Sequence, residues 1–151
     1  MVLDTSALLA MLFDEPEAPA FEEAIAQDPT RLLSAASLFE AAMVVETRLG
    51  EAGGRELDLL LHKAQIEVIP VTVEQVEIAR HAFRTYGKGR HPAGLNYGDC
   101  FAYALSRLAV EPLLFKGGDF GRTDVVGVSE SKPGGSTHRS APTEGPPVSG
   151  P

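Results

Sequence analysis

Short apolar runs alternate with longer amphipathic segments along residues 1–128. The short runs, rich in Leu, Ile and Val, predict strands over 1–4, 31–34, 67–71, 112–116 and 124–128. The longer segments predict helices over 6–13, 18–27, 38–50, 55–65, 73–86 and 97–108. Short strands separated by helices favour parallel pairing through right-handed crossovers. The expected fold is therefore a three-layer α/β/α sandwich with a short central parallel sheet.

The apolar positions of the last two predicted helices recur at spacings of three and four, which predicts one apolar face on each helix. These positions are Val76, Ala79, Phe83 and Tyr86 in the first helix, and Tyr97, Phe101, Ala104 and Leu108 in the second. We expect both faces to pack on the sheet.

The composition changes at residue 129. Residues 129–151 are dominated by Pro, Gly, Ser and Thr, with Val148 as the single large apolar side chain. Such a segment cannot bury enough surface to order itself, so we expect a disordered tail. Residues 1–128 are long enough for one domain with its own core.

The net charge narrows the classes of function. The chain carries a formal charge of -8, which argues against coating of nucleic acid or of an acidic membrane by a general positive field. The one cysteine, Cys100, excludes an intramolecular disulfide and a multi-thiolate zinc site, and it fits a reducing cytoplasm. We see no signal peptide and no membrane-spanning run, so we expect a cytoplasmic protein.

Carboxylates follow the predicted strands, where parallel α/β sheets bind their ligands. They are Asp4, Glu40, Asp99, Asp119 and Asp124. Four of them also have an ordinary structural explanation. Asp4 could be a helix N-cap and Asp119 a turn residue, while Ser37 to Glu40 fits the spacing of a capping box and Asn96 to Asp99 is a near relative of that motif. Taken together, they predict a cluster of hard oxygen ligands, which suits Mg²⁺ or Mn²⁺ and phosphodiester chemistry.

Basic residues occur on the loops that adjoin these carboxylates. Lys88 and Arg90 belong to a glycine-rich segment over 87–94, and Lys116 and Arg122 flank Asp119. All four are candidates for contacts with phosphate. Ordinary solvated loop positions explain them equally well.

Four segments together resemble PIN-domain ribonucleases of the VapC toxin type. They read VLDTSALL over 2–9, SLFE over 37–40, LNYGDCFAYA over 95–104 and PLLFKGGDFGRTD over 112–124. The resemblance covers residues 1–128 and implies a PIN-like nuclease domain, whereas the tail lies outside it. One departure is Gly118, where relatives often carry a polar or acidic residue.

The resemblance implies a divalent-metal-dependent endoribonuclease that a cognate antitoxin holds inactive. By motif position, the acidic quartet is Asp4, Glu40, Asp99 and Asp119, with Asp4 and Asp99 as direct Mg²⁺ or Mn²⁺ ligands. Asp124 would be an accessory carboxylate, and the hydroxyl of Thr5 or Ser6 would support the metal. A homodimer is typical of the family. We also expect the antitoxin to insert a basic side chain among the carboxylates.

Two other functions remain open at this point. A non-toxic PIN nuclease of RNA maturation would use the same carboxylates without an antitoxin. A catalytically silent module would use them to bind a basic peptide.

Overall fold

The computed structural model describes residues 1–128; the predicted tail over 129–151 lies outside the described residues. The strands are β1 (Val2–Leu3), β2 (Leu32–Ser34), β3 (Glu67–Ile69) and β4 (Leu113–Leu114). The helices are α1 (Thr5–Leu12), α2 (Ala18–Gln27), α3 (Ala35–Lys63), α4 (Val73–Tyr86) and α5 (Tyr97–Ala109), followed by a short 3₁₀ helix, η1 (Phe120–Arg122).

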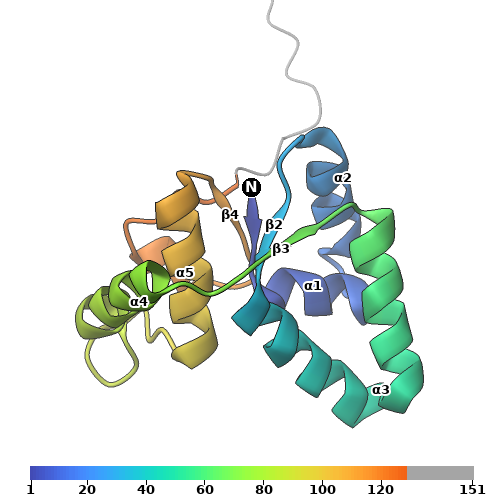
Figure 1. Cartoon of the computed structure of the whole chain (residues 1–151), viewed down its shortest axis with the longest axis horizontal. Helices are drawn as coiled ribbons and strands as arrows, with labels where there is room; N and C mark the ends of the chain where they lie inside the picture. The colour runs from blue at the N-terminus through green and yellow to red at the C-terminus, as the bar shows by residue number, and fades with distance from the viewer. Residues whose placement is uncertain (129–151) are drawn as a thin grey trace, which may run out of the picture.

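The four strands form one parallel sheet in the order β3-β2-β1-β4. Helices α1, α2 and α3 lie on one side of the sheet and α5 on the other (Figure 1). This arrangement confirms the predicted three-layer α/β/α fold. None of the helices in residues 1–128 is both long and apolar enough to cross a membrane.

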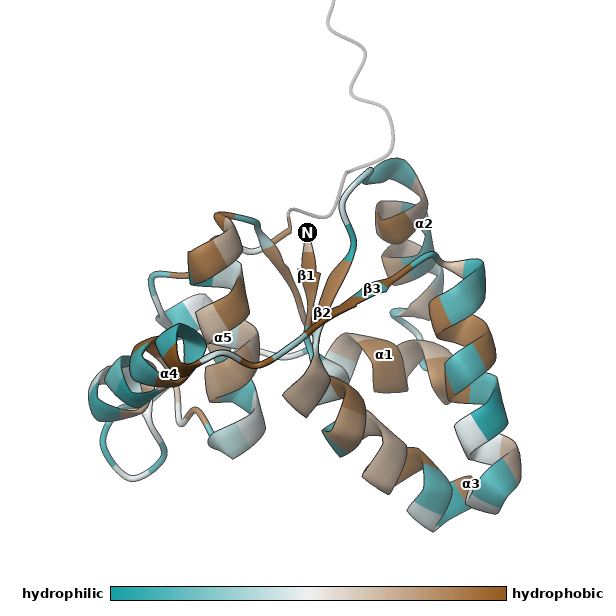
Figure 2. Cartoon of the chain, in the orientation of Figure 1, coloured by the Kyte–Doolittle hydropathy of each residue, from teal (hydrophilic) through white to brown (hydrophobic). Residues whose placement is uncertain are grey.

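Alternation along the strands divides the core into two halves. Successive residues of a strand point to opposite faces of the sheet. Accordingly Leu3 and Leu114 pack with α1, α2 and α3, whereas Val2 and Leu113 pack with α5. All four side chains are almost completely buried. Strands β1 and β4 are hydrophobic along their length, whereas much of the surface of α4 is hydrophilic (Figure 2).

The predicted apolar faces of α4 and α5 are only partly correct. Helix α5 is buried from Cys100 to Ser106, because the sheet covers one side of it and α4 the other. Helix α4 packs mainly on α5 instead of on the sheet. It buries Ala79 and Ala82, while Val76 and Phe83 are exposed. Small side chains allow this close helix packing, so the buried face is rotated from the predicted one.

The predicted strand over 124–128 is wrong. This segment makes a single parallel bridge, between Gly127 and Leu113 on the outer edge of β4. The Leu113 amide donates to the Val126 carbonyl, and the Val128 amide donates to the Leu113 carbonyl. The segment covers an edge of the sheet without extending it as a regular strand.

Gly50 bends α3 between the two helices that the sequence predicts. Its φ of 63° lies in the left-handed region, which glycine adopts without the steric penalty of a Cβ atom. The two halves of α3 therefore diverge at this residue (Figure 1). The first half begins close to the carboxyl end of β2 and carries Glu40.

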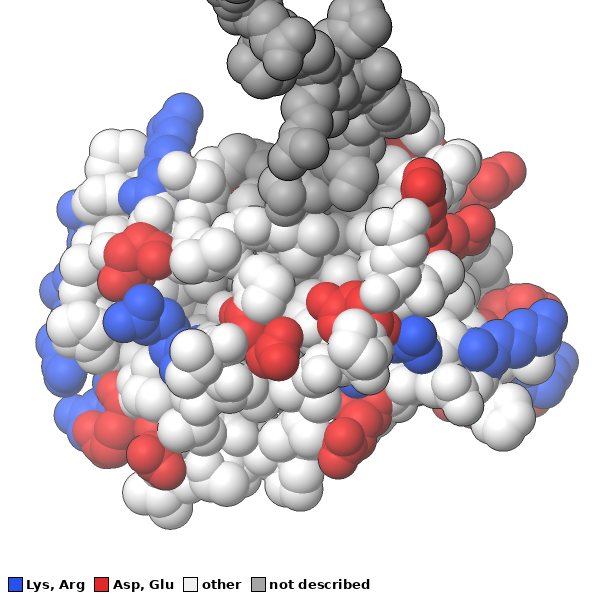
Figure 3. Space-filling model, turned by 90° about the horizontal axis from the view of Figure 1, so that it is seen from above, with Lys and Arg blue, Asp and Glu red and all other residues white. Residues whose placement is uncertain are grey.

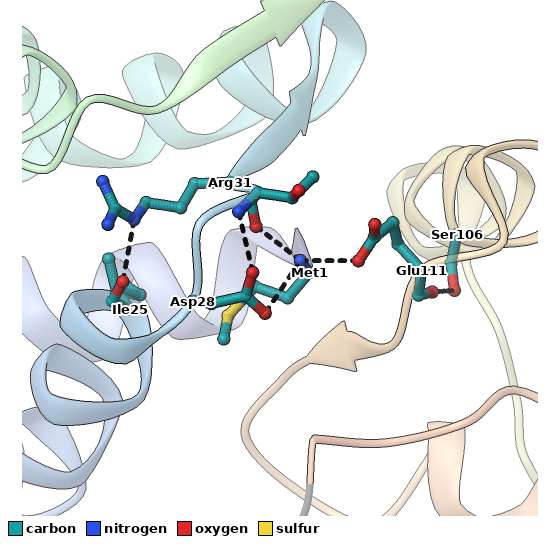
Figure 4. Close-up of polar contacts among 7 residues, drawn as sticks. Met1, Ile25, Asp28, Arg31, Ser106 and Glu111 are labelled. Carbon is teal, nitrogen blue, oxygen red and sulfur yellow. Dashed lines mark hydrogen bonds and ion pairs between the residues drawn. The ribbon is translucent and has the colours of Figure 1, made fainter.

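The α-ammonium of Met1 joins three parts of the fold at the opposite end of the sheet (Figure 4). It lies 3.1 Å from Asp28 Oδ2 and 2.9 Å from Glu111 Oε2, and it also donates to the Thr30 carbonyl. Met1 is buried, so these carboxylates compensate for the removal of its charge from water. The contacts fix the start of β1 between the connections that lead into β2 and β4.

Candidate active site

Four carboxylates meet at the end of the sheet where the strands terminate. Asp4 follows β1 directly, Glu40 lies in α3 after β2, and Asp119 follows β4. Asp99 is in the first turn of α5, which packs against β1, β2 and β4 and leads back toward the start of β4. The negative charges of Asp4, Glu40 and Asp119 all raise the pKa of Asp99, so these three carboxylates lie within electrostatic range of it at this end of the sheet.

Asp4 ends β1 and caps α1, as its sequence context predicts. Its Oδ2 accepts hydrogen bonds from the Ser6 amide at 2.9 Å and from the Ser6 hydroxyl at 2.6 Å. The Ser6 hydroxyl in turn accepts from the Lys116 amide at 3.0 Å. The neighbouring Thr5 hydroxyl donates to the Ser37 carbonyl at 3.2 Å. Ser6 thus connects Asp4 to the chain after β4, and Thr5 connects it to α3.

Asp99 is held by a capping box at the start of α5. The Asn96 side chain accepts from the Asp99 amide, and Asp99 Oδ2 accepts from the Asn96 amide, both at 2.9 Å. This reciprocal pair satisfies two amides that a helix N-terminus leaves free. The sequence predicts this motif correctly, and the motif fixes the direction of the Asp99 side chain.

The predicted capping box of Ser37 and Glu40 is wrong. Helix α3 begins at Ala35 with Ser34 as its N-cap, so Ser37 and Glu40 lie inside the helix. They are three positions apart, which places their side chains next to each other on one surface of the helix. The buried Ser37 hydroxyl has no hydrogen-bond partner among residues 1–128. The Glu40 carboxylate is likewise free of a capping role and points toward α5, as its contact with position 98 shows.

Burial makes three of the carboxylates difficult to ionise, and neighbouring negative charge adds to this effect at two of them. Burial raises the pKa of Asp4 against the opposing effect of its bonds to Ser6. Burial raises the pKa of Glu40 as well, with a further contribution from the charge of Asp4. The pKa of Asp99 rises to about 6, first through burial and then through the charges of the other three. Such clustering of like charges costs stability and is typical of functional sites.

The side chains fit a divalent cation in chemistry but are not yet arranged around one. Within residues 1–128, no three Asp, Glu, His or Cys side chains stand in positions that would hold a metal ion. In this arrangement Asp4 Oδ2 accepts from the Ser6 amide and Asp99 Oδ2 accepts from the Asn96 amide. No salt bridge in this part of the chain involves the quartet, and its donors are all hard oxygens of the kind that Mg²⁺ and Mn²⁺ prefer.

The structure places Asp124 in a different environment from the quartet. Its Oδ1 accepts from the Tyr103 hydroxyl at 2.7 Å, and its Oδ2 lies 3.7 Å from Arg107. Tyr103 and Arg107 lie one and two turns farther along α5 than Asp99. Although some burial opposes it, these partners lower the pKa of Asp124, the reverse of the shift at Asp99. Asp124 connects the segment after η1 to α5.

The four basic candidates differ in their contacts within the protein. Lys116 forms ion pairs with Glu15 and Glu17, the second at 3.3 Å. Arg90 lies over the Phe83 ring at 5.2 Å. The Lys88 amide donates to the Leu95 carbonyl, and Arg122 Nη1 donates to the Pro92 carbonyl at 3.2 Å. Lys88 and Arg122 thus border the loop that leads into Asn96 and Asp99, whereas Lys116 is neutralised beside α2.

Charges of both signs occur on the face of the molecule at which the strands begin. Seen from the top of Figure 1, where the strands begin, basic and acidic side chains are interspersed over the visible described surface (Figure 3). They form no continuous basic area on this face.

Cys100, next to Asp99, is buried as predicted. Burial, and then the charge of Asp99, raise the pKa of its thiol to about 11. The thiol is therefore not an activated nucleophile.

Gly98 is the residue that sequence reasoning missed. It occurs in the quoted motif, at the second position of the predicted helix over 97–108. A Cβ atom at this position would lie 1.5 Å from Glu40 Oε2. The signal that could have found it is the presence of glycine inside a helix, where it is unfavourable.

Comparison with known proteins identifies the family. Residues 1–126 match the PIN domain. The chain is 58% identical over 129 residues to the ribonuclease VapC30 of Mycobacterium tuberculosis, covering 85% of this chain and 98% of that protein. It is also 58% identical over 128 residues to a VapC ribonuclease of Mycolicibacterium smegmatis. This match covers 85% of this chain and 99% of that protein.

Solved structures support the same fold. The crystal structure of Mycobacterium tuberculosis VapC20, described as a sarcin-ricin loop cleaving toxin, aligns with a TM-score of 0.69 at 18% identity and covers 84% of this chain and 97% of that one. The structure of VapBC-1 from nontypeable Haemophilus influenzae aligns with a TM-score of 0.68 at 17% identity. The alignment covers 87% of this chain and 98% of that one. The sequence matches and the shared fold together establish that this chain belongs to the PIN-domain family and, within it, to the VapC ribonucleases.

Proposed function

We propose that this protein is the toxin of a type II toxin–antitoxin pair and that it cleaves RNA phosphodiester bonds with a divalent cation, Mg²⁺ or Mn²⁺. The observation that carries the proposal is the convergence of Asp4, Glu40, Asp99 and Asp119 at one end of the sheet, without a positive partner among residues 1–128. Repulsion between these carboxylates destabilises the fold, and a bound cation would remove that cost. We place this activity in the cytoplasm, where RNA is available.

Asp4 and Asp99 are the proposed direct ligands, because both are fixed at the start of a helix and both resist ionisation without a cation. Glu40 and Asp119 support them from α3 and from the turn after β4. The hydroxyls of Thr5 and Ser6 are the proposed support for the metal, since that of Ser6 donates to the Asp4 carboxylate and that of Thr5 connects the same turn to α3. When bound, a divalent cation supplies an activated water and stabilises the charge that develops on the phosphate.

The basic residues near the quartet suggest how RNA is recognised. Lys88 and Arg122 border the loop before Asp99 and are the proposed contacts for RNA phosphates, with Arg90 as a third. Lys116 is less available, because Glu15 and Glu17 already pair with it.

The same carboxylates provide a receptor for a cognate antitoxin. An arginine can form two parallel hydrogen bonds with a carboxylate, and the quartet offers several carboxylates without a basic partner in the described part of the chain. We propose that the antitoxin inserts a basic side chain there, thereby competing with the cation.

We also propose that the protein forms a homodimer. Light scattering of the purified protein would test this.

Cleavage of a structured RNA in Mg²⁺ tests the enzymatic part of the proposal. Asp4→Asn and Asp99→Asn should each abolish cleavage, because each removes a proposed direct ligand while preserving shape. Asp58→Asn, at an exposed carboxylate of α3, is the matched control and should cleave like the wild type. Cleavage that persists in both site variants, or that proceeds unchanged in EDTA, would refute the proposal.

Expression without a partner tests the toxin part separately. The wild-type protein should arrest growth, and Asp99→Asn should not. If the wild-type protein cleaves RNA in vitro but leaves growth unaffected, it is a nuclease without toxin function. If it binds Arg-bearing peptides tightly but neither binds Mg²⁺ nor cleaves RNA, it is a binding module.

A further inference from the structure

Gly98 occupies the second position of α5, between the cap residue Asn96 and Asp99. It is buried, and the Glu40 carboxylate from α3 lies directly against it. An added Cβ would approach Glu40 Oε2 to 1.5 Å, the Glu40 carboxyl carbon to 2.5 Å and Oε1 to 2.9 Å. Any side chain at position 98 would therefore occupy the space that the Glu40 carboxylate fills.

Two ordinary reasons for a glycine do not apply here. The φ of Gly98 is not among the positive values that Gly50, Gly89, Gly94 and Gly117 adopt, so its backbone does not require glycine. Helix propensity also favours alanine over glycine inside a helix. What remains is the close approach of Glu40.

We propose that Gly98 is a positioning residue, whose missing side chain allows the Glu40 carboxylate to reach the quartet. This inference rests on the proposed metal-dependent function, and it assigns position 98 a role in setting the affinity for the divalent cation. With a Cβ in place, Glu40 must rotate away from α5, which leaves fewer oxygens near Asp4 and Asp99. Loss of residues that orient metal ligands commonly reduces metal affinity by about 10-fold to 100-fold.

A double-mutant cycle separates this role from a general effect on the helix. The four proteins are the wild type, Gly98→Ala, Glu40→Ala and the double variant, and the measurements are Mn²⁺ binding by calorimetry and the Tm without cation. Gly98→Ala should weaken Mn²⁺ binding about 10-fold in the wild-type background. In the Glu40→Ala background it should have almost no effect, because no carboxylate remains to be displaced.

Gly54→Ala is the matched control. Gly54 also lies inside a helix next to a glutamate, since its added Cβ would approach Glu46 Oε1 to 2.9 Å. Glu46 is exposed, does not belong to the quartet and can rotate into solvent. Gly54→Ala should therefore leave Mn²⁺ binding unchanged.

The Tm without cation keeps the test independent of the proposed function. Gly98→Ala should raise the Tm more in the Glu40→Ala background than in the wild-type background, because only the latter contains the clash. If the wild type binds no Mn²⁺ but this difference in Tm appears, the metal-dependent function fails and the packing of Gly98 against Glu40 stands. If the wild type binds Mn²⁺ and Gly98→Ala has the same effect in both backgrounds, the role of Gly98 is refuted.

Discussion

Asp99→Asn should make the metal-free protein more stable while it removes metal binding. Asparagine has nearly the same shape as aspartate, and its side-chain oxygen can still accept the hydrogen bond from the Asn96 amide. The substitution therefore preserves the capping box of α5 and removes one negative charge from the quartet.

The pKa of Asp99 determines the size and the pH range of this effect. It rises from 3.8 to about 6 on folding, so the folded protein binds this proton more tightly than the unfolded chain does. The cost of ionising Asp99 is therefore absent below about pH 4, grows up to about pH 6 and is complete above it. A pKa difference of about 2 corresponds to about 3 kcal/mol. Because Asp99 is partly exposed and solvent screens its charge, we expect about 1.5 kcal/mol.

Urea unfolding at pH 4 and pH 7 in EDTA measures the prediction. Asp99→Asn should raise the free energy of unfolding by about 1.5 kcal/mol at pH 7, or its Tm by about 5 °C, and should have almost no effect at pH 4. Addition of Mg²⁺ at 100 times its Kd should stabilise the wild type alone by about 2.7 kcal/mol, which reverses the order of stability.

The control for this experiment is again Asp58→Asn, which should change neither value. The reasoning fails if Asp99→Asn is less stable than the wild type in EDTA at pH 7, or if its effect is the same at both pH values. Equal stabilisation of both proteins by Mg²⁺ would show that Asp99 is not a ligand.

Two further substitutions test contacts outside the quartet. Asp28→Asn weakens the charged contact with the Met1 ammonium and should lower the free energy of unfolding by about 1 to 3 kcal/mol, measured by urea unfolding at pH 7. Asp124→Asn removes the ion pair with Arg107 but leaves an acceptor for the Tyr103 hydroxyl. It should cost less than about 1 kcal/mol and leave Mn²⁺ affinity unchanged in calorimetry, whereas an accessory ligand would lose affinity.

Much of the fold could be predicted because it depends on local patterns. Hydrophobic runs and helical spacing predict four of the strands, and glycine marks the bend in α3 at Gly50. The prediction failed where the conformation or the buried face of a segment depends on the strand or helix that packs against it. The segment over 124–128 is held by one bridge at the sheet edge, and α4 is covered by α5 on a face that its own spacing does not reveal.

For the candidate site, the sequence by itself determined which residues could take part and how two of them are held. The caps formed by Asp4 and by Asn96 with Asp99 are contacts within three residues, so their spacing is sufficient to predict them. Composition also determined that recognition of RNA must be confined to a limited area, because the net charge is -8.

Only the tertiary structure decided which carboxylates repel one another. Asp99 and Asp124 look alike in the sequence, yet burial beside Asp4 and Glu40 raises the pKa of the first, and Tyr103 with Arg107 lowers that of the second. Residues distant in sequence supply burial and neighbouring charge, and these two quantities set the energy of an ionised group. For the same physical reason, the space that Gly98 leaves for the Glu40 carboxylate becomes visible only when α3 and α5 are packed together.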